Sequence, residues 1–304
     1  MSEPAKEYKF ISYETFEDGK IARIMLDRPD ARNAQNRGML VELDQAFLRA
    51  EADDTVRVVI LGGEGPLFSS GHDMGSAVAR EEYASHPTSK INGATRTGTE
   101  SRMLQEWHYY FENTRRWRNL RKVTIAQVHG KVYGAGLMLM WACDLIVGSD
   151  DATFADVVGA RLGMCGLEYF AHPWEFGARK TKELLLTGDC MDVDEAHALG
   201  MVAKVFPRDD LADKTVEFAR RIADLPTMTA LMIKESVNQT QDNQGFHNAL
   251  NACFTIHQLN HSHWAEVHDD KFPAAKTEDG IPDWREAPPI VPAEKGSVRA
   301  EVSS

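Results

Sequence analysis

The first half of the chain alternates short β-branched segments with segments whose hydrophobic residues recur at helical spacing. Residues 20–27 (KIARIMLD) predict a strand. Residues 38–54 then place Leu40, Leu43 and Phe47 on one face of a predicted helix. This alternation of strands and helices is typical of an α/β protein.

Further hydrophobic segments extend the same pattern toward the middle of the chain. Residues 56–63 (VRVVILGG), 123–130 and 143–150 predict buried strands. A short helix is predicted between the last two strands, at residues 136–142 (GLMLMWA). Strands connected in this way pair in parallel with right-handed crossovers, so we expect a parallel sheet.

The chain becomes mostly helical from about Glu168 onward. Helical spacing recurs in five segments, at residues 180–188, 192–200, 212–225, 229–240 and 246–259. Gly188 and Gly200 stand where helix C-caps are expected. By contrast, residues 77–102 are polar and lack periodicity, which predicts a long surface loop.

The length, the amino-acid composition and the net charge predict a soluble globular protein. With 304 residues, 43% hydrophobic and 26% charged, the chain is long enough to bury a sizeable core. No apolar run approaches the roughly 20 residues that span a bilayer, and the N-terminus has no apolar signal core. The four cysteines show no metal-ligand spacing and predict reduced thiols in a cytoplasmic protein. A net charge of −12 disfavours nucleic-acid and membrane partners.

Gly134 and Gly136 form a G-x-G turn between a predicted strand and helix, a pairing common in dinucleotide-binding proteins. Asp150 ends the following strand, as a ribose-binding acid would. The match is partial, because Leu139 occupies the position that requires a third small residue.

A second turn of small residues, Ser69–Asp73, also follows a predicted strand. Two such turns can direct two backbone N–H groups at one point and stabilise a developing oxyanion. Small residues allow the close approach that this requires. Two ordinary strand-to-helix turns would have the same spacing, so the pattern alone leaves both interpretations open.

Several motifs, in order, resemble the crotonase superfamily, which includes the enoyl-CoA hydratases and isomerases. The similarity runs from about Ile11 to His268, through the segments RPDARNAQ, FSSGHDM, HGKVYGAGLMLMWACDLIVGSDDATF, LLLTGD and EAHALGMVAKVFP. It implies an α/β crotonase fold of stacked ββα turns in residues 1–205 and a helical trimerisation region in 206–268. We expect residues 269–304, rich in proline and charge, to be extended or disordered.

The resemblance also implies a substrate and a site. An acyl-CoA thioester would form an enolate-like intermediate held by the backbone amides of His72 and Ala135. Coenzyme A would enter as part of the substrate, with no further cofactor and no metal. A homotrimer or a dimer of trimers is implied as well. The family's coenzyme A contacts fall on Arg32, Ala34, Ser70, Gly71, Asp73, Met74 and Lys234, and basic residues among them suit its phosphates.

The chain departs from this family at the two glutamates of the hydratases. Met138 stands in the position of the first, and Val157 and Val158 occupy the region of the second. A hydratase needs polar groups to position water and to deliver a proton. The usual two-glutamate mechanism is therefore not expected here.

Two other carboxylates are candidates for moving the proton. Glu168 lies near the position of the single acid of the superfamily's isomerases, and Asp156 lies just before the missing second glutamate. An apolar pocket would raise the pKa of Glu168 through desolvation, although an acid there could also serve a helix N-terminus. Asp156 could equally be a turn-forming residue. His172 would share a helix face with Glu168 and could orient it, or be a packed structural histidine.

Two clusters allow other interpretations. His257 and His261 have the spacing of a metal pair, but no cysteine or acid accompanies them at ligand spacing, which favours a solvated helix end. Residues 107–122 interleave aromatic and basic side chains as RNA-binding segments do, although an amphipathic helix is the simpler interpretation.

The sequence therefore predicts an enoyl-CoA hydratase/isomerase-like enzyme with a non-standard acid or base. A coenzyme A-binding scaffold without catalysis is the first alternative. Another thioester reaction on the same scaffold, hydrolysis or dehalogenation, is the second.

Overall fold

A computed structural model of the chain describes residues 8–85, 98–270 and 290–292. Its centre is a six-stranded sheet of order β1-β2-β3-β4-β6-β9, in which only the β1–β2 pair is antiparallel. Its strands are β1 Ile11–Phe16, β2 Ile21–Leu26, β3 Val58–Gly63, β4 Val123–Val128, β6 Leu145–Ser149 and β9 Lys204–Phe206. The predicted strands and their parallel pairing are confirmed.

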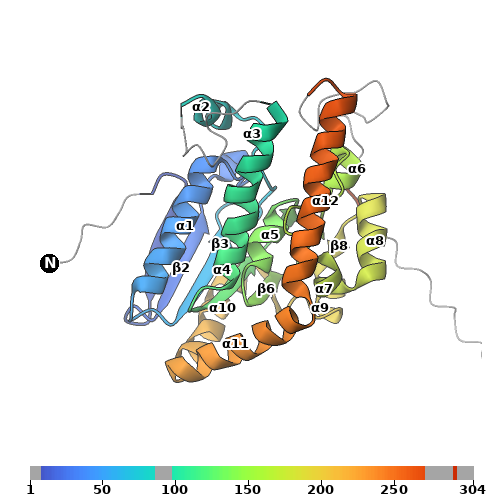
Figure 1. Cartoon of the computed structure of the whole chain (residues 1–304). Coiled ribbons are helices and arrows are strands. Elements are labelled where there is room, and N and C mark those ends of the chain that lie inside the picture. Colours follow the sequence, from blue (N-terminus) through green and yellow to red (C-terminus); the bar gives the residue numbers. More distant parts are fainter. Residues whose placement is uncertain (1–7, 86–97, 271–289, 293–304) are drawn as a thin grey trace, which may run out of the picture.

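Helices cover both faces of this sheet (Figure 1). On β3, Val59 and Leu61 join the core that includes α1 (Arg37–Ala52), while Val58 and Ile60 pack toward α10 (Leu211–Ala223). Side chains of a strand alternate between the two faces, so a strand covered on both sides is hydrophobic throughout.

A second sheet of three short strands stands beside the first. Its order is β5-β7-β8, with β5 Lys131–Tyr133, β7 Thr153–Ala155 and β8 Met191–Asp192. The short helix α5 (Gly136–Trp141) follows β5 at the predicted position. The G-x-G turn thus connects the second sheet to a buried helix.

The later part of the chain is mostly helical, as predicted. Besides α10, the predicted segments overlap α8 Ala178–Thr187, α9 Val193–Ala198, α11 Thr227–Asn243 and α12 Phe246–Val267. The two short helices α6 Val158–Leu162 and α7 His172–Phe176 lie outside the predicted segments. Gly188 ends α8 in the left-handed conformation, as a helix C-cap does. Figure 1 shows α12 beside the column formed by α3 (Gly98–Gln105), the π-helix η3 (Glu106–Glu112) and α4 (Asn113–Arg118). None of the helices in the described ranges is long and apolar enough to cross a membrane.

The prediction of one long loop at residues 77–102 is wrong at both ends. Residues Ala77–Ser85 form α2, and α3 begins at Gly98. Ala79 is buried, so a tertiary contact stabilises a helix that hydrophobic periodicity does not reveal. Residues 86–97 lie outside the described residues, as does most of the expected tail at 269–304. Within that tail, the carbonyl of Val291 accepts a hydrogen bond from the Cys190 amide.

Candidate active site

The two glycine turns lie in direct contact. Gly71 has φ +97°, and a Cβ atom there would lie 3.0 Å from both the Ala135 nitrogen and the Tyr133 carbonyl oxygen. A Cβ atom on Gly136 would lie 2.8 Å from the Ser69 carbonyl oxygen. Only glycine fits at these positions, so the small residues of both motifs are needed for the turns to approach each other.

Among the described residues, two backbone amides have no hydrogen-bond partner where the turns meet. Around them the amides are paired: Asp73 donates to the Gln35 carbonyl at 3.1 Å and Gly134 donates to the Ala155 carbonyl at 2.9 Å. Within the described part of the chain, the amides of His72 and Ala135 donate no hydrogen bond. Buried donors are normally paired, so this arrangement suits a ligand oxygen that accepts from both.

A cavity of about 530 Å³ opens over these turns. His72 and Ala135 line it. So do all the predicted coenzyme A contacts except Lys234, namely Arg32, Ala34, Ser70, Gly71, Asp73 and Met74. Asp73 also organises the turn, because its carboxylate pairs with Arg28 at 2.9 Å and accepts a hydrogen bond from the Ser76 amide. Segments distant in the sequence therefore form one pocket.

A smaller cavity, about 70 Å³ in volume, shares His72, Asp73 and Met74 with the first. Glu168 lines this inner cavity and is 5% exposed. The geometry places the carboxylate beside the turn that carries one of the two unpaired amides.

His72 lines both cavities. The sequence analysis predicted a role only for its backbone amide, but its imidazole also contacts the site. Its Nε2 lies 3.3 Å from Oε2 of Glu168, and its ring stacks on Tyr110 with centroids 3.6 Å apart. Burial opposes ionisation of Glu168, but the charge and hydrogen bond of His72, with the charge of His257, outweigh it and lower the pKa. The expected rise in the pKa of Glu168 is therefore wrong, because desolvation is not the only influence on a carboxylate that faces imidazoles.

Asp156 occupies a different environment. Its carboxylate accepts hydrogen bonds from the amides of Val158 and Leu167, at 2.9 and 3.2 Å, and lies 3.0 Å from His172 Nε2. Asp156 and His172 are both buried, and neither lines the two cavities described above. The expected helix face shared by Glu168 and His172 does not form, because α7 begins only at His172.

Met138, Val157 and Val158 are the residues that the family resemblance places where hydratases carry glutamates. Val157 and Val158 line the larger cavity, and Met138 is buried in α5. No carboxylate replaces them at these positions. Glu168 reaches the inner cavity from a different segment, between α6 and α7.

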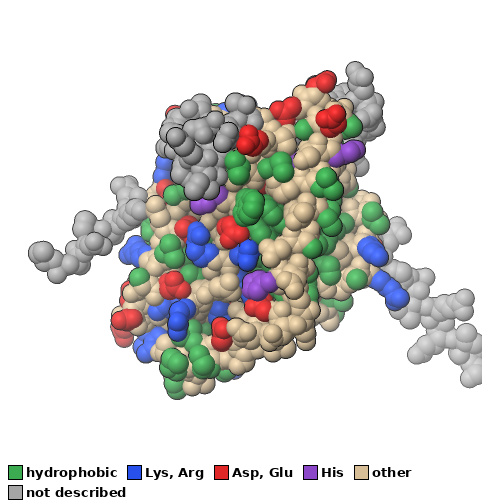
Figure 2. Space-filling view, viewed as in Figure 1, with side chains coloured by type: hydrophobic (Ala, Val, Ile, Leu, Met, Phe, Trp, Pro, Cys, Tyr) green, Lys and Arg blue, Asp and Glu red, His purple; other side chains and the backbone are tan. Residues whose placement is uncertain are grey.

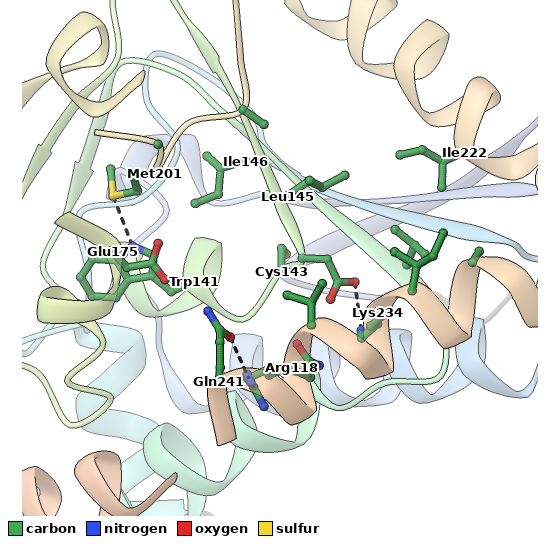
Figure 3. A pocket seen from close by; sticks show the side chains of 18 of the residues that line it. Arg118, Trp141, Cys143, Leu145, Ile146, Glu175, Met201, Ile222, Lys234 and Gln241 are labelled. Carbon is green, nitrogen blue, oxygen red and sulfur yellow. Dashed lines mark hydrogen bonds and ion pairs between the residues drawn. The ribbon is translucent and has the colours of Figure 1, made fainter. Parts of the chain in front are cut away.

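Lys234 lies in another part of the molecule. Its Nζ contacts Asp144 Oδ2 at 2.9 Å and the Lys122 carbonyl at 3.0 Å, and its side chain is 8% exposed. It lines a separate cavity of about 440 Å³ with Arg118, Trp141 and Glu175 (Figure 3). Within this chain, Lys234 is not brought together with the other predicted coenzyme A contacts.

The histidines of α12 are not at a solvated helix end. His257 and His261 are buried, 3% and 5% exposed, and both face the carboxylate of Glu106 on η3. The expectation of solvated histidines is thus wrong for these two. The i,i+4 spacing was the only signal in the sequence, because the acid comes from a helix about 150 residues earlier.

Glu106 is held as a carboxylate by its neighbours. Burial opposes its ionisation, but hydrogen bonds to His257 and His261 outweigh it and lower the pKa to about 2. Glu106, His257 and His261 line the same inner cavity as Glu168. Sequence reasoning did not find Glu106 or Tyr110 as members of this site.

Comparison with known proteins identifies the family of this chain. The sequence model of the enoyl-CoA hydratase/isomerase family matches residues 17–286. A Mycobacterium tuberculosis protein named "Putative enoyl-CoA hydratase EchA13" is 67% identical over 294 residues, covering 95% of this chain and 92% of that protein. The Arthrobacter protein "4-chlorobenzoyl coenzyme A dehalogenase-2" is 31% identical, covering 81% of this chain and 85% of its own.

Solved structures show the same architecture. The structure of "a probable enoyl-CoA hydratase from Mycobacterium smegmatis" superposes with a TM-score of 0.77 at 41% identity. The match covers 87% of this chain and 98% of that one. The predicted crotonase fold is confirmed, and the chain belongs to the enoyl-CoA hydratase/isomerase family.

Proposed function

We propose that the chain processes an acyl-CoA thioester, with the amides of His72 and Ala135 holding the thioester oxygen as it becomes an enolate. The observation that carries this proposal is the pair of unpaired amides in the wall of the larger cavity. Preorganised donors of this kind stabilise developing negative charge, usually the largest contribution to catalysis. No cofactor besides the coenzyme A of the substrate is required.

Glu168 is the residue that we expect to move the proton. Of the other carboxylates that line the two cavities, Asp73 is paired with Arg28, Glu106 faces two histidines, and Asp30 is exposed to solvent. Asp156 is occupied by two backbone amides and His172. A single carboxylate can carry a proton between the α and γ carbons, which suits isomerisation. Hydration would need a second group to position water.

The test is turnover of two thioesters, crotonyl-CoA and a 3-enoyl-CoA, followed by ultraviolet absorbance. Glu168→Gln should lower kcat by about 10²–10⁴-fold, the usual contribution of a positioned acid or base. Glu266→Gln is the matched control, because Glu266 is an exposed carboxylate on α12. Unchanged turnover in Glu168→Gln would exclude this role for Glu168.

Two other functions remain as alternatives, and the same assays separate them. Coenzyme A binding without turnover of any thioester would favour a non-catalytic scaffold, which the apolar Met138, Val157 and Val158 motivate. The likeness to "4-chlorobenzoyl coenzyme A dehalogenase-2" motivates a second assay, halide release from a halogenated aroyl-CoA. Release of free thiol without halide would instead indicate thioester hydrolysis.

The trimer, or dimer of trimers, implied by the family resemblance is also part of this proposal. Hydrophobic side chains gather at the end of α11 in Figure 2. Met228, Met232, Ile233 and Val237 of this helix are 48–60% exposed in the single chain. Exposed apolar surface of this kind is typical of an interface. Light scattering after size exclusion should give three or six chains per particle, and a monomer would contradict this.

A further inference from the structure

Three buried side chains from two helices converge at the inner cavity. Glu106 comes from the π-helix η3, and His257 and His261 come from successive turns of α12. One ligand atom from each lies within 4.8 Å of the others. Glu106 Oε1 is 2.8 Å from His261 Nε2, and Glu106 Oε2 is 3.4 Å from His257 Nε2. π-helical turns occur frequently at functional sites because they redirect side chains.

The hydrogen bonding of His257 decides which of its ring atoms faces this cluster. Nδ1 lies 2.9 Å from the Gly166 carbonyl oxygen, which can only accept, so Nδ1 carries the hydrogen. Nε2 then faces two carboxylates, Glu106 at 3.4 Å and Glu168 at 3.8 Å. A nitrogen between two carboxylates is favourable when it holds a cation, either a proton or a metal ion.

We propose that Glu106, His257 and His261 bind a first-row divalent metal ion such as Zn²⁺. Two imidazole nitrogens and one carboxylate are a common donor set for such ions. Bond lengths of about 2.0–2.2 Å place neighbouring ligand atoms about 3–3.5 Å apart. The separations of the Glu106 oxygens from the two histidines are close to this spacing, and one ligand atom from each residue lies within 4.8 Å of the others, so the three side chains would draw together around an ion.

The neighbouring groups have the positions that partners of metal ligands take. The Gly166 carbonyl fixes the tautomer of His257 and leaves Nε2 to coordinate, a recurrent arrangement in metalloproteins. The Gln258 amide donates to Glu106 Oε2 at 3.1 Å and orients that carboxylate. These contacts hold two of the three ligands before an ion arrives.

Three protein ligands leave one position of a tetrahedral ion open, as catalytic zinc sites do. All three ligands line the cavity that Glu168 and His72 also line, so an open position directed into this cavity would lie near Glu168. The inference goes beyond the proposed function, because ion binding requires no substrate. A water or a substrate oxygen would occupy the open position, with Glu168 close enough to accept its proton.

The experiment measures ion binding to the full-length protein after chelator treatment. Titration with Co²⁺ should produce visible d–d absorption that saturates at one equivalent and that Zn²⁺ removes. Metal analysis after Zn²⁺ dialysis should give one ion per chain. His261→Ala and Glu106→Gln should weaken binding by more than the roughly 10–100-fold that loss of an outer partner costs.

His263→Ala is the matched control, because His263 is an exposed histidine on the same helix. It should bind Co²⁺ as the unaltered protein does. Glu106→Gln preserves the shape of the side chain, so a circular dichroism spectrum and Tm can show that weaker binding is not unfolding. No saturable absorption, or equal binding by Glu106→Gln, would overturn the proposal and leave a protonated His257 as the positive charge. Thioester turnover without added metal tests the proposed function independently.

Discussion

His72 Nε2 and Glu168 Oε2 lie 3.3 Å apart across the inner cavity, although 96 residues separate them in the chain. The residue whose amide is proposed to hold the thioester oxygen therefore also contacts the proposed proton carrier through its side chain. Tyr110 stacks on the same imidazole and limits its rotation. We therefore expect His72 to position Glu168 through its side chain as well as to provide a backbone donor.

Replacing His72 with alanine separates these two roles, because the backbone amide remains. We expect kcat to fall by about 10–100-fold, less than the roughly 10²–10⁴-fold loss expected on removal of an acid or base itself. KM should change little, and His72→Gln should recover part of the rate by donating to Glu168. Steady-state kinetics check this. Equal loss in both variants, or a change confined to KM, would contradict a positioning role.

Gly71→Ala tests the contact between the two turns. A Cβ atom would be strained at φ +97° and would crowd the Ala135 amide at 3.0 Å. Gly200→Ala is the control, with φ +88° but no atom within 4 Å of the added Cβ. Both should lower the free energy of unfolding, by about 1–3 kcal/mol for the backbone strain. Only Gly71→Ala should also reduce kcat. Equal activity in the two variants would show that the contact is not needed for turnover.

Asp156→Asn distinguishes a structural carboxylate from a catalytic one. Asp156 accepts two backbone hydrogen bonds and faces a buried histidine, so the change should cost about 2–4 kcal/mol of unfolding free energy. Activity per folded molecule should stay within a few-fold at temperatures where the variant is folded. Urea denaturation and kinetics on the same preparation measure both. A stable variant with greatly reduced kcat would instead return Asp156 to a catalytic role.

Arg32 and Lys234 should respond differently to alanine. Arg32 is exposed at the larger cavity, so Arg32→Ala should raise KM by about 3–10-fold, as for a charged contact worth about 1 kcal/mol. Lys234→Ala would leave Asp144 without its ion-pair partner and should lower stability by about 3 kcal/mol. Steady-state kinetics measure KM, urea denaturation measures the free energy of unfolding, and calorimetric titration measures coenzyme A binding by both variants. Weaker binding in Lys234→Ala alone would show that this lysine reaches the nucleotide.

Glu175 should make stability depend on pH. Burial in the 440 Å³ cavity raises its pKa to about 7, against the opposing charge of Arg118. The unfolded chain releases this proton near pH 4.5, whereas the folded chain holds it, so stability falls as pH rises from there to about 7. Because Glu175 is only partly buried by surface area, the gain from Glu175→Gln at pH 8 should be about 1–2 kcal/mol.

Urea denaturation at pH 5 and pH 8 measures this difference. At pH 5 the variant and the unaltered protein should have similar stability, because the native carboxyl is then largely protonated. Glu235→Gln is the control, because Glu235 is an exposed carboxylate on α11. Its effect on the free energy of unfolding should be the same at the two pH values. If Glu175→Gln raised the free energy of unfolding equally at both pH values, the raised pKa of Glu175 would not be the cause of the pH dependence.

The strands and most helices follow from local patterns. The β-branched residues of β3 and β4 are hydrophobic at every position because helices cover both faces of the sheet, and such segments are evident without coordinates. α2 was missed because its sequence lacks a clear hydrophobic period, so packing rather than pattern stabilises it.

The sequence by itself determined the superfamily and the two glycine turns, because each depends on contiguous motifs of residue types. Only the tertiary structure decided which side chains meet. Glu168 joined His72, Asp156 joined His172, and Glu106 joined two histidines of α12. These contacts depend on how helices and turns pack across long separations in the chain. The pKa of Glu168 depends on them too, because burial raises it and only the packed imidazoles lower it.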